Sequence, residues 1–158
     1  MIRLAGINPN DIVDGNDICV SVWLQGCPHH CPQCHNPETW SFSGGKEYNE
    51  EEIIEKIISL INKNGIQRNL SLLGGEPLCP QNINFSLQLA KRVKEKYPNI
   101  KVFCWTGYLL EELDENKLKD IDILIDGKYD YKKRDITLYL RGSSNQRVLY
   151  KKIDFLKK

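Results

Sequence analysis

The sequence predicts an α/β fold, specifically a partial (open) β/α barrel of about five mainly parallel strands with crossover helices. Short runs of β-branched and aromatic residues alternate with amphipathic segments at intervals of roughly thirty residues, a pattern typical of parallel sheets built from crossovers. A closed eight-stranded barrel takes about 250 residues. A chain of 158 residues can therefore supply only part of one.

The predicted elements alternate along the chain. Strands are expected at residues 18–25, 70–73, 100–105, 121–126 and 146–150, and helices at 49–64, 83–97 and 109–118. Residues 2–7 and 11–14 predict a small hairpin or an extended segment around a turn. Asn49 is expected to cap the first helix, whose isoleucines recur on one face. Cys19 and Cys104 lie inside apolar strands and are expected to be buried.

The composition indicates a single soluble domain spanning residues 1–158. Hydrophobic residues make up 41% and charged residues 27% of the chain, an ordinary balance for a globular protein. No stretch approaches the roughly 20 apolar residues of a membrane span, and residues 1–9 lack the apolar core of a signal peptide. We therefore expect a cytoplasmic protein whose six cysteines stay reduced.

Three cysteines fall within eight residues after the first predicted central strand: Cys27, Cys31 and Cys34, spaced CxxxCxxC. Thiolates are the usual ligands of iron–sulfur clusters, and a 4Fe–4S cluster normally takes four of them. Three local ligands leave one iron open to a substrate or cofactor. Two alternatives stay open on this loop alone. They are a structural zinc site completed by a neighbouring histidine and a redox dithiol formed by Cys31 and Cys34.

A second motif, Gly74-Gly75-Glu76-Pro77, follows the predicted strand at 70–73. Two glycines allow the backbone to approach a ligand closely, and a carboxylate can hold an ammonium group. Both motifs follow strand ends, where folds of this kind bind ligands.

The cysteine loop and this turn resemble the signature of radical S-adenosylmethionine (SAM) enzymes. In that family SAM binds the open iron, and its reductive cleavage releases a 5′-deoxyadenosyl radical. The wider set of motifs is similar to that of activating proteins of anaerobic ribonucleoside-triphosphate reductase, and it covers nearly the whole chain. These motifs are residues 23–29, 34–36, 74–77, 105–108, 125–127 and 141–147.

This resemblance implies an oxidoreductase with a single radical SAM domain, which forms a glycyl radical on the large subunit of that reductase. It implies a 4Fe–4S cluster and SAM as cofactors, and no catalytic acid or base from the chain. Two alternatives remain. The first is an activase of another glycyl-radical enzyme, such as pyruvate formate-lyase, and the second is a non-enzymatic zinc-binding or electron-transfer module.

The resemblance also implies the site residues. Cys27, Cys31 and Cys34 would bind the cluster, and SAM would contact Gln33, Cys34, His35, Gly74, Gly75, Glu76, Thr106, Asp126, Lys128, Asn145 and Arg147. Many radical SAM enzymes have an aromatic residue where this chain has Gln33. Adenine is therefore expected on the backbone of residues 33–35 or on a side chain from elsewhere, with His35 as the candidate. Two alternatives to SAM binding stay open here. Asp126 to Lys128 equally predicts a simple turn with a solvated lysine, and residues 141–147 equally predict a polar turn.

Charge is distributed unevenly. Residues 128–158 hold ten Lys and Arg against three Asp, a net charge of +7, whereas the first 127 residues carry −6. The basic segment is compatible with an acidic protein partner, and equally with a solvated helix end, which is the commoner case. By resemblance, the partner would be a flavodoxin-like or other low-potential electron donor. No nucleic-acid-binding motif accompanies the charge, so neither nucleic acid nor membrane is expected as a partner.

Overall fold

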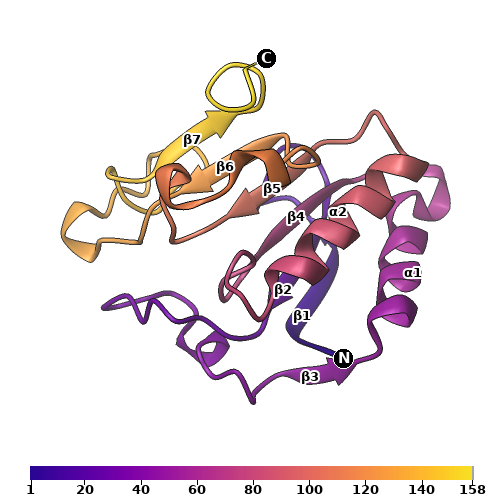
Figure 1. Cartoon of the computed structure of the whole chain (residues 1–158), viewed down its shortest axis with the longest axis horizontal. Coiled ribbons are helices and arrows are strands. Elements are labelled where there is room, and N and C mark those ends of the chain that lie inside the picture. The colour runs from indigo at the N-terminus through magenta and orange to yellow at the C-terminus, as the bar shows by residue number, and fades with distance from the viewer. Residues whose placement is uncertain (158) are drawn as a thin grey trace.

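The computed structural model describes residues 1–157, which form a seven-stranded mixed sheet in the order β3-β1-β2-β4-β5-β6-β7 (Figure 1). The strands are β1 (Ile2–Asp11), β2 (Cys19–Leu24), β3 (Lys46–Tyr48), β4 (Asn69–Gly74), β5 (Val102–Trp105), β6 (Ile123–Asp126) and β7 (Arg147–Tyr150). The α-helices of the described residues are α1 (Glu50–Ile61) and α2 (Ile83–Lys96). Residues 1–157 contain no helix that has the length and apolar character to cross a bilayer.

The four central strands, β2, β4, β5 and β6, run parallel to one another. The predicted parallel centre is therefore confirmed, but the sheet is wider than expected because β1 and β3 add an antiparallel edge and β7 closes the other side antiparallel to β6. Of the two forms expected for the N-terminal segment, the structure has the extended one. The carboxyl ends of the four parallel strands meet at one edge, where the loops that carry the motifs begin.

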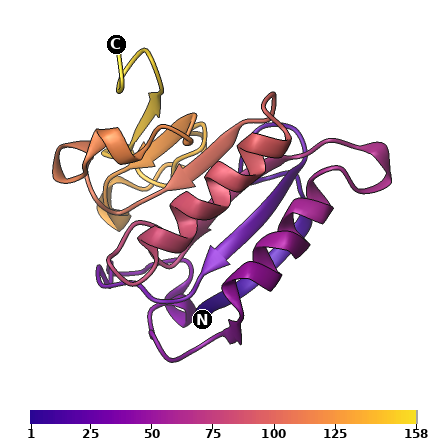
Figure 2. The same ribbon diagram turned by 45° about the vertical axis from the view of Figure 1, so that its right-hand side comes forward.

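Both α-helices cover the same face of the sheet (Figure 2). The isoleucines of α1 form the apolar stripe that the sequence predicts, and all five are buried: Ile53, Ile54, Ile57, Ile58 and Ile61. Asn49 caps this helix as expected, because its side chain accepts a hydrogen bond from Glu52 N at 3.1 Å. Cys104 belongs to this core and Cys19 lies at the start of β2, and both are fully buried as predicted.

Loops cover the opposite face of the sheet. Phe103, Ile123 and Ile125 are buried there against Leu140 and Val148, which come from the C-terminal part of the chain. The cysteine loop and the loop after β6 project from the same side of the molecule, away from the two helices (Figure 1). A cleft lies between these loops, at the carboxyl ends of the central strands.

The prediction of a helix at residues 109–118 is wrong. The segment forms two separate 3₁₀ turns, Leu110–Glu112 and Glu115–Lys117, joined through Leu113 in an extended conformation. The Glu112 side chain accepts from Leu109 N at 2.9 Å, and the Asp114 side chain accepts from Asn116 N at 3.1 Å. The Glu112 bond caps the start of the first turn. The Asp114 bond takes up Asn116 N, a backbone donor that a continuous helix would use, and so favours a break that the apolar spacing does not reveal.

Candidate metal and cofactor site

The cysteine loop leaves the end of β2 and returns beside its own start. Gly26 N donates to Thr39 O at 2.7 Å, and Cys27 N donates to Trp40 O at 3.1 Å. The Gln25 side chain, which is buried, donates to Glu38 O and Ser41 O at 2.9 and 2.7 Å. The segment between these contacts is thus a closed loop with fixed ends.

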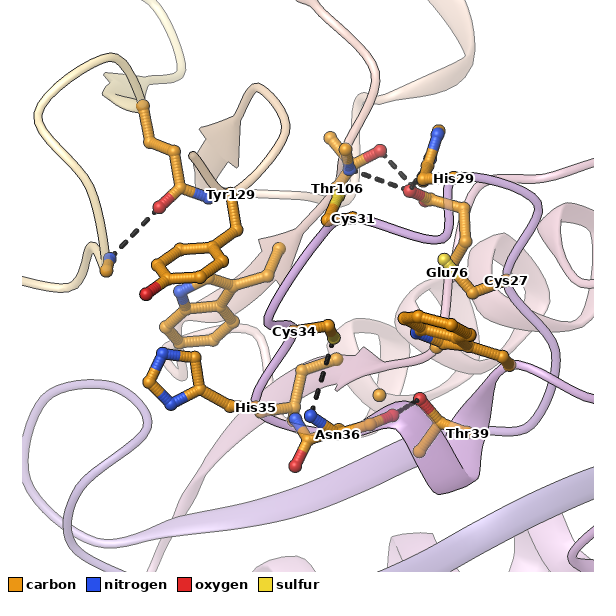
Figure 3. A pocket seen from close by; sticks show the side chains of 18 of the residues that line it. Cys27, His29, Cys31, Cys34, His35, Asn36, Thr39, Glu76, Thr106 and Tyr129 are labelled. Atoms are coloured by element: carbon orange, nitrogen blue, oxygen red, sulfur yellow. Dashed lines mark hydrogen bonds and ion pairs between the residues drawn. The ribbon is translucent and has the colours of Figure 1, made fainter. Parts of the chain in front are cut away.

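The three cysteines of the loop line one cleft of about 250 Å³. Figure 3 shows the side chains of Cys27, Cys31 and Cys34 facing a common space, with Glu76 and Thr106 beyond it. All three thiols are free; Cys27 is buried, and the other two are partly exposed. Among residues 1–157, no three His, Cys, Asp or Glu side chains converge closely enough to hold a single metal ion.

The surroundings of the thiols combine burial with hydrogen-bond donors. Burial raises the pKa of Cys27 to about 11, although the backbone N–H groups of His29 and His30 act in the opposite direction. Burial also raises the pKa of Cys31. Asn36 N donates to Cys34 Sγ at 3.4 Å. The site therefore disfavours free thiolates but offers N–H groups to sulfur, a combination that suits thiolates bound to a metal.

Glu76 lies at the centre of the polar contacts in the cleft and is fully buried. Its Oε1 accepts from Gly107 N at 2.7 Å and lies 2.7 Å from His29 Nε2. Its Oε2 accepts from Leu78 N and Thr106 Oγ1, both at 2.8 Å. A carboxylate offers about four acceptor positions, so this side chain is already saturated by protein donors. It ties together the loops that follow β2, β4 and β5.

The glycines of the same turn are required by the neighbouring strand. A Cβ on Gly74 would lie 2.4 Å from Leu24 O, and one on Gly75 would lie 2.3 Å from the same atom. Gly74 also has φ of +129°, which L side chains rarely adopt. The backbone that the glycines allow to approach is thus β2, immediately before the cysteine loop.

Asn82, which was not among the predicted site residues, contacts both motifs. This buried side chain donates from Nδ2 to Gln25 O at 3.2 Å and to Glu76 O at 3.0 Å. It therefore fixes the start of the cysteine loop relative to the Gly-Gly-Glu turn. A polar residue just before a helix is usually interpreted as a cap, but Asn82 makes no cap bond to α2.

Eight of the predicted site residues line the cleft: Cys27, Cys31, Cys34, His35, Gly74, Gly75, Glu76 and Thr106. His35 is exposed, and its ring meets that of Tyr129 edge-on at 4.8 Å between centroids (Figure 3). Gln33 lies outside the cleft lining, exposed, with φ of +57°. Tyr129 was not among the predicted site residues, because nothing in the local sequence pattern marks its side chain.

The remaining predicted residues belong to a neighbouring network outside the cleft lining. Asp126 is fully buried, and it accepts from Leu110 N at 2.8 Å and from Arg147 Nε at 3.0 Å. This ion pair, together with Glu111, raises the pKa of Arg147. Asn145 donates to Lys128 O at 2.8 Å, and the Lys128 side chain is exposed. These contacts fix the loop after β6 in place.

Comparison with known proteins agrees with this geometry. Residues 13–149 match a family model described as a 4Fe-4S single cluster domain. The fold, the cysteine loop and this match define the chain as a single-cluster iron–sulfur protein.

The chain is also similar to curated proteins named anaerobic ribonucleoside-triphosphate reductase-activating protein. The relative from Vibrio cholerae is 42% identical over 142 residues, which cover 87% of this chain and 91% of the relative. The relative from Escherichia coli is 38% identical, with 89% and 93% covered, and that from Enterobacteria phage T4 is 37% identical, with 90% of each covered. The chain belongs to the family of anaerobic ribonucleoside-triphosphate reductase-activating proteins.

Proposed function

We propose that this chain activates an anaerobic ribonucleoside-triphosphate reductase by forming a glycyl radical on its large subunit, as a radical SAM enzyme. The observation that carries the proposal is the cleft itself, in which three free thiols face the Gly-Gly-Glu turn at the carboxyl ends of parallel strands. Membership of a family whose curated members are named activating proteins of anaerobic ribonucleoside-triphosphate reductase supports it. In this proposal residues 1–158 form a single radical SAM domain, and the sheet is a partial barrel.

Cys27, Cys31 and Cys34 are proposed to bind a 4Fe–4S cluster. The fit rests on three features. The thiols share one cleft. Backbone N–H groups donate to the sulfur atoms of Cys27 and Cys34. Trp40, which also lines the cleft, has a buried indole N–H without a partner within residues 1–157. All three suit an electron-rich group in that space. When bound, the reduced cluster supplies one electron that breaks a carbon–sulfur bond of SAM, and the resulting radical removes a hydrogen atom from glycine.

Glu76, Gly75 and Thr106 are the proposed contacts of the methionine part of SAM, with Lys128 as a further candidate. Because the carboxylate of Glu76 is saturated, an ammonium group must replace one of its donors. We expect His29 to be the donor that is displaced from Glu76, because its side chain can rotate away whereas the backbone groups Gly107 N and Leu78 N cannot. Gln33 and His35 remain proposed neighbours of adenine, with Tyr129 beside His35.

The chain needs no acid or base for hydrogen-atom transfer. Its work is to hold the reacting groups in position and to limit access of water. The cleft opens to solvent between the cysteine loop and the loop after β6, so the reductase is expected to cover it. We therefore expect SAM cleavage to be slow or uncoupled when the reductase is absent.

The electron donor is proposed to be an acidic flavodoxin-like protein that meets the basic segment 128–158. Lys132, Lys133 and Arg134 are all exposed in this segment. Reversing these three charges should slow cluster reduction and weaken its dependence on salt. Lys56→Glu, at an exposed position on α1, is the matched control. Unchanged rates in the triple variant would contradict this part of the proposal.

The cluster and SAM are tested by anaerobic reconstitution with iron and sulfide, followed by EPR of the reduced protein with and without SAM. We expect a reduced 4Fe–4S signal whose shape changes when SAM is added. Alanine at Cys27, Cys31 or Cys34 should abolish it, whereas Cys79→Ala should not, since that buried thiol lies outside the cleft lining. A protein that binds one zinc ion and gives no cluster signal would overturn the proposal.

A further inference from the structure

Trp40 lines the cleft, and its indole carries a buried N–H without a partner. Its Nε1 is inaccessible to solvent and makes no hydrogen bond to any atom of residues 1–157. A buried donor that stays unpaired costs about 1–3 kcal/mol, and each such group in a native protein calls for a reason, such as an ion or a redox role. The described residues hold two other buried side-chain atoms of this kind, Arg68 Nε and Arg141 Nε, but neither residue lines the cleft.

The ring of Trp40 is fixed where it lies. It stacks on the His30 ring, with centroids 4.7 Å apart and planes 7° from parallel. Its backbone is held at both ends, because Trp40 N donates to Pro37 O at 3.2 Å and Trp40 O accepts from Cys27 N. The indole therefore belongs to the cysteine loop and cannot easily turn its N–H toward another acceptor.

A second tryptophan in the same cleft provides a comparison. Trp105 also lines the cleft, but its Nε1 donates to Leu140 O at 2.8 Å. Of these two indoles, only that of Trp40 has an unpaired N–H, and Trp40 shares the cleft lining with the three cysteines. An indole N–H can only donate, so its missing partner must be an acceptor that enters the cleft.

We propose that Trp40 Nε1–H donates a hydrogen bond to a sulfur of the cluster held by Cys27, Cys31 and Cys34, and thereby makes the cluster easier to reduce. A cluster with three thiolates is negatively charged, and one-electron reduction adds further charge to its sulfurs. A hydrogen bond to sulfur therefore stabilises the reduced state more than the oxidised state. The inference rests on the cluster of the proposed function, and it assigns to Trp40 a tuning role.

The test compares Trp40→Phe with Trp105→Phe in the reconstituted full-length protein without SAM. Phenylalanine keeps an aromatic ring against His30 and removes the N–H. We expect Trp40→Phe to lower the ratio of reduced to oxidised cluster about threefold to tenfold at a fixed potential. This corresponds to a midpoint about 30–60 mV more negative for one electron. Trp105→Phe, which loses a donor already bonded to the protein, should leave the midpoint unchanged.

A spectroscopic measurement on the wild-type protein keeps the inference testable if the variant fails to bind iron. With isotope-labelled indole nitrogen, pulsed EPR of the reduced cluster should detect a coupling to one tryptophan nitrogen and its exchangeable proton. That coupling should persist in Trp105→Phe. An unchanged midpoint in Trp40→Phe, or no indole coupling in the wild type, overturns this inference alone. A wild-type protein that assembles no cluster overturns the proposed function with it.

Discussion

Replacing Glu76 by glutamine should destabilise the protein even without cluster or SAM. Each carboxylate oxygen accepts from a backbone N–H whose direction is fixed: Gly107 N on Oε1 and Leu78 N on Oε2. An amide has only one oxygen, so in either orientation its NH₂ group must face one of these N–H groups. The variant therefore keeps the shape of the side chain and loses at least one buried, charge-assisted hydrogen bond.

The size of this effect follows from the burial of the site. A hydrogen bond to a charged group contributes about 1.5–3 kcal/mol, and a buried N–H left unpaired adds to the loss. We expect Glu76→Gln to lower the free energy of unfolding by about 2–4 kcal/mol, a large part of the 5–15 kcal/mol typical of a domain. With a urea m-value of about 2 kcal/mol per molar, the midpoint falls by about 1–2 M.

The assay is urea unfolding of the metal-free, reduced protein at neutral pH, followed by tryptophan fluorescence. Glu112→Gln is the matched control, because Glu112 is exposed and its cap bond to Leu109 N can be made equally well by an amide. The control should stay within about 0.5 kcal/mol of the wild type. If Glu76→Gln does so too, then Glu76 serves only a ligand and the structural reasoning is refuted.

Three further predictions concern stability. Burial and the neighbouring Asp11 raise the pKa of Asp14 from 3.8 to about 7. The contribution of Asp14 to the free energy of unfolding is therefore complete below pH 3.8 and is lost as pH rises through about 7. The free energy of unfolding of Asp14→Asn should therefore rise by about 1–2 kcal/mol relative to the wild type as pH increases across that window. A difference in urea unfolding that does not change with pH would contradict this. Gly75→Ala, whose Cβ would lie 2.3 Å from Leu24 O, should cost about 3 kcal/mol and lower the bound iron, and full iron content with wild-type stability would exclude the clash. Asn49→Ala should lower the melting temperature through a loss of about 1 kcal/mol, and no change would mean that the cap adds nothing.

The sequence was sufficient for the parallel centre of the sheet. The strands that carry the motifs are short apolar runs ending in glycine or polar residues, and α1 has both a capping residue and an apolar stripe. The antiparallel edge escaped prediction because Lys46–Tyr48 is short and polar and forms a strand only by pairing with β1. The form of segment 109–118 was not predicted, because the Asp114 side chain takes up Asn116 N, which a continuous helix would use, and the apolar spacing does not reveal this bond.

The part of the site that consists of recognisable motifs could be predicted from the sequence. The three cysteines and the Gly-Gly-Glu turn lie together in the cleft because they follow adjacent parallel strands. The roles of Asn82 and Trp40 were not predictable, since each depends on atoms that are distant in the sequence or on the absence of a partner within the described chain. The ion pair between Asp126 and Arg147 likewise could be recognised only in the structure.

The most direct test of the account is the transfer of the radical to the reductase. The reconstituted protein, SAM, a low-potential reductant and the large subunit of the reductase from the same source are mixed without oxygen, and the large subunit is examined by EPR. We predict a glycyl radical together with an equal amount of 5′-deoxyadenosine, and neither product when Cys31 is replaced by alanine. An intact cluster that binds SAM but yields no radical on the reductase would contradict the central claim.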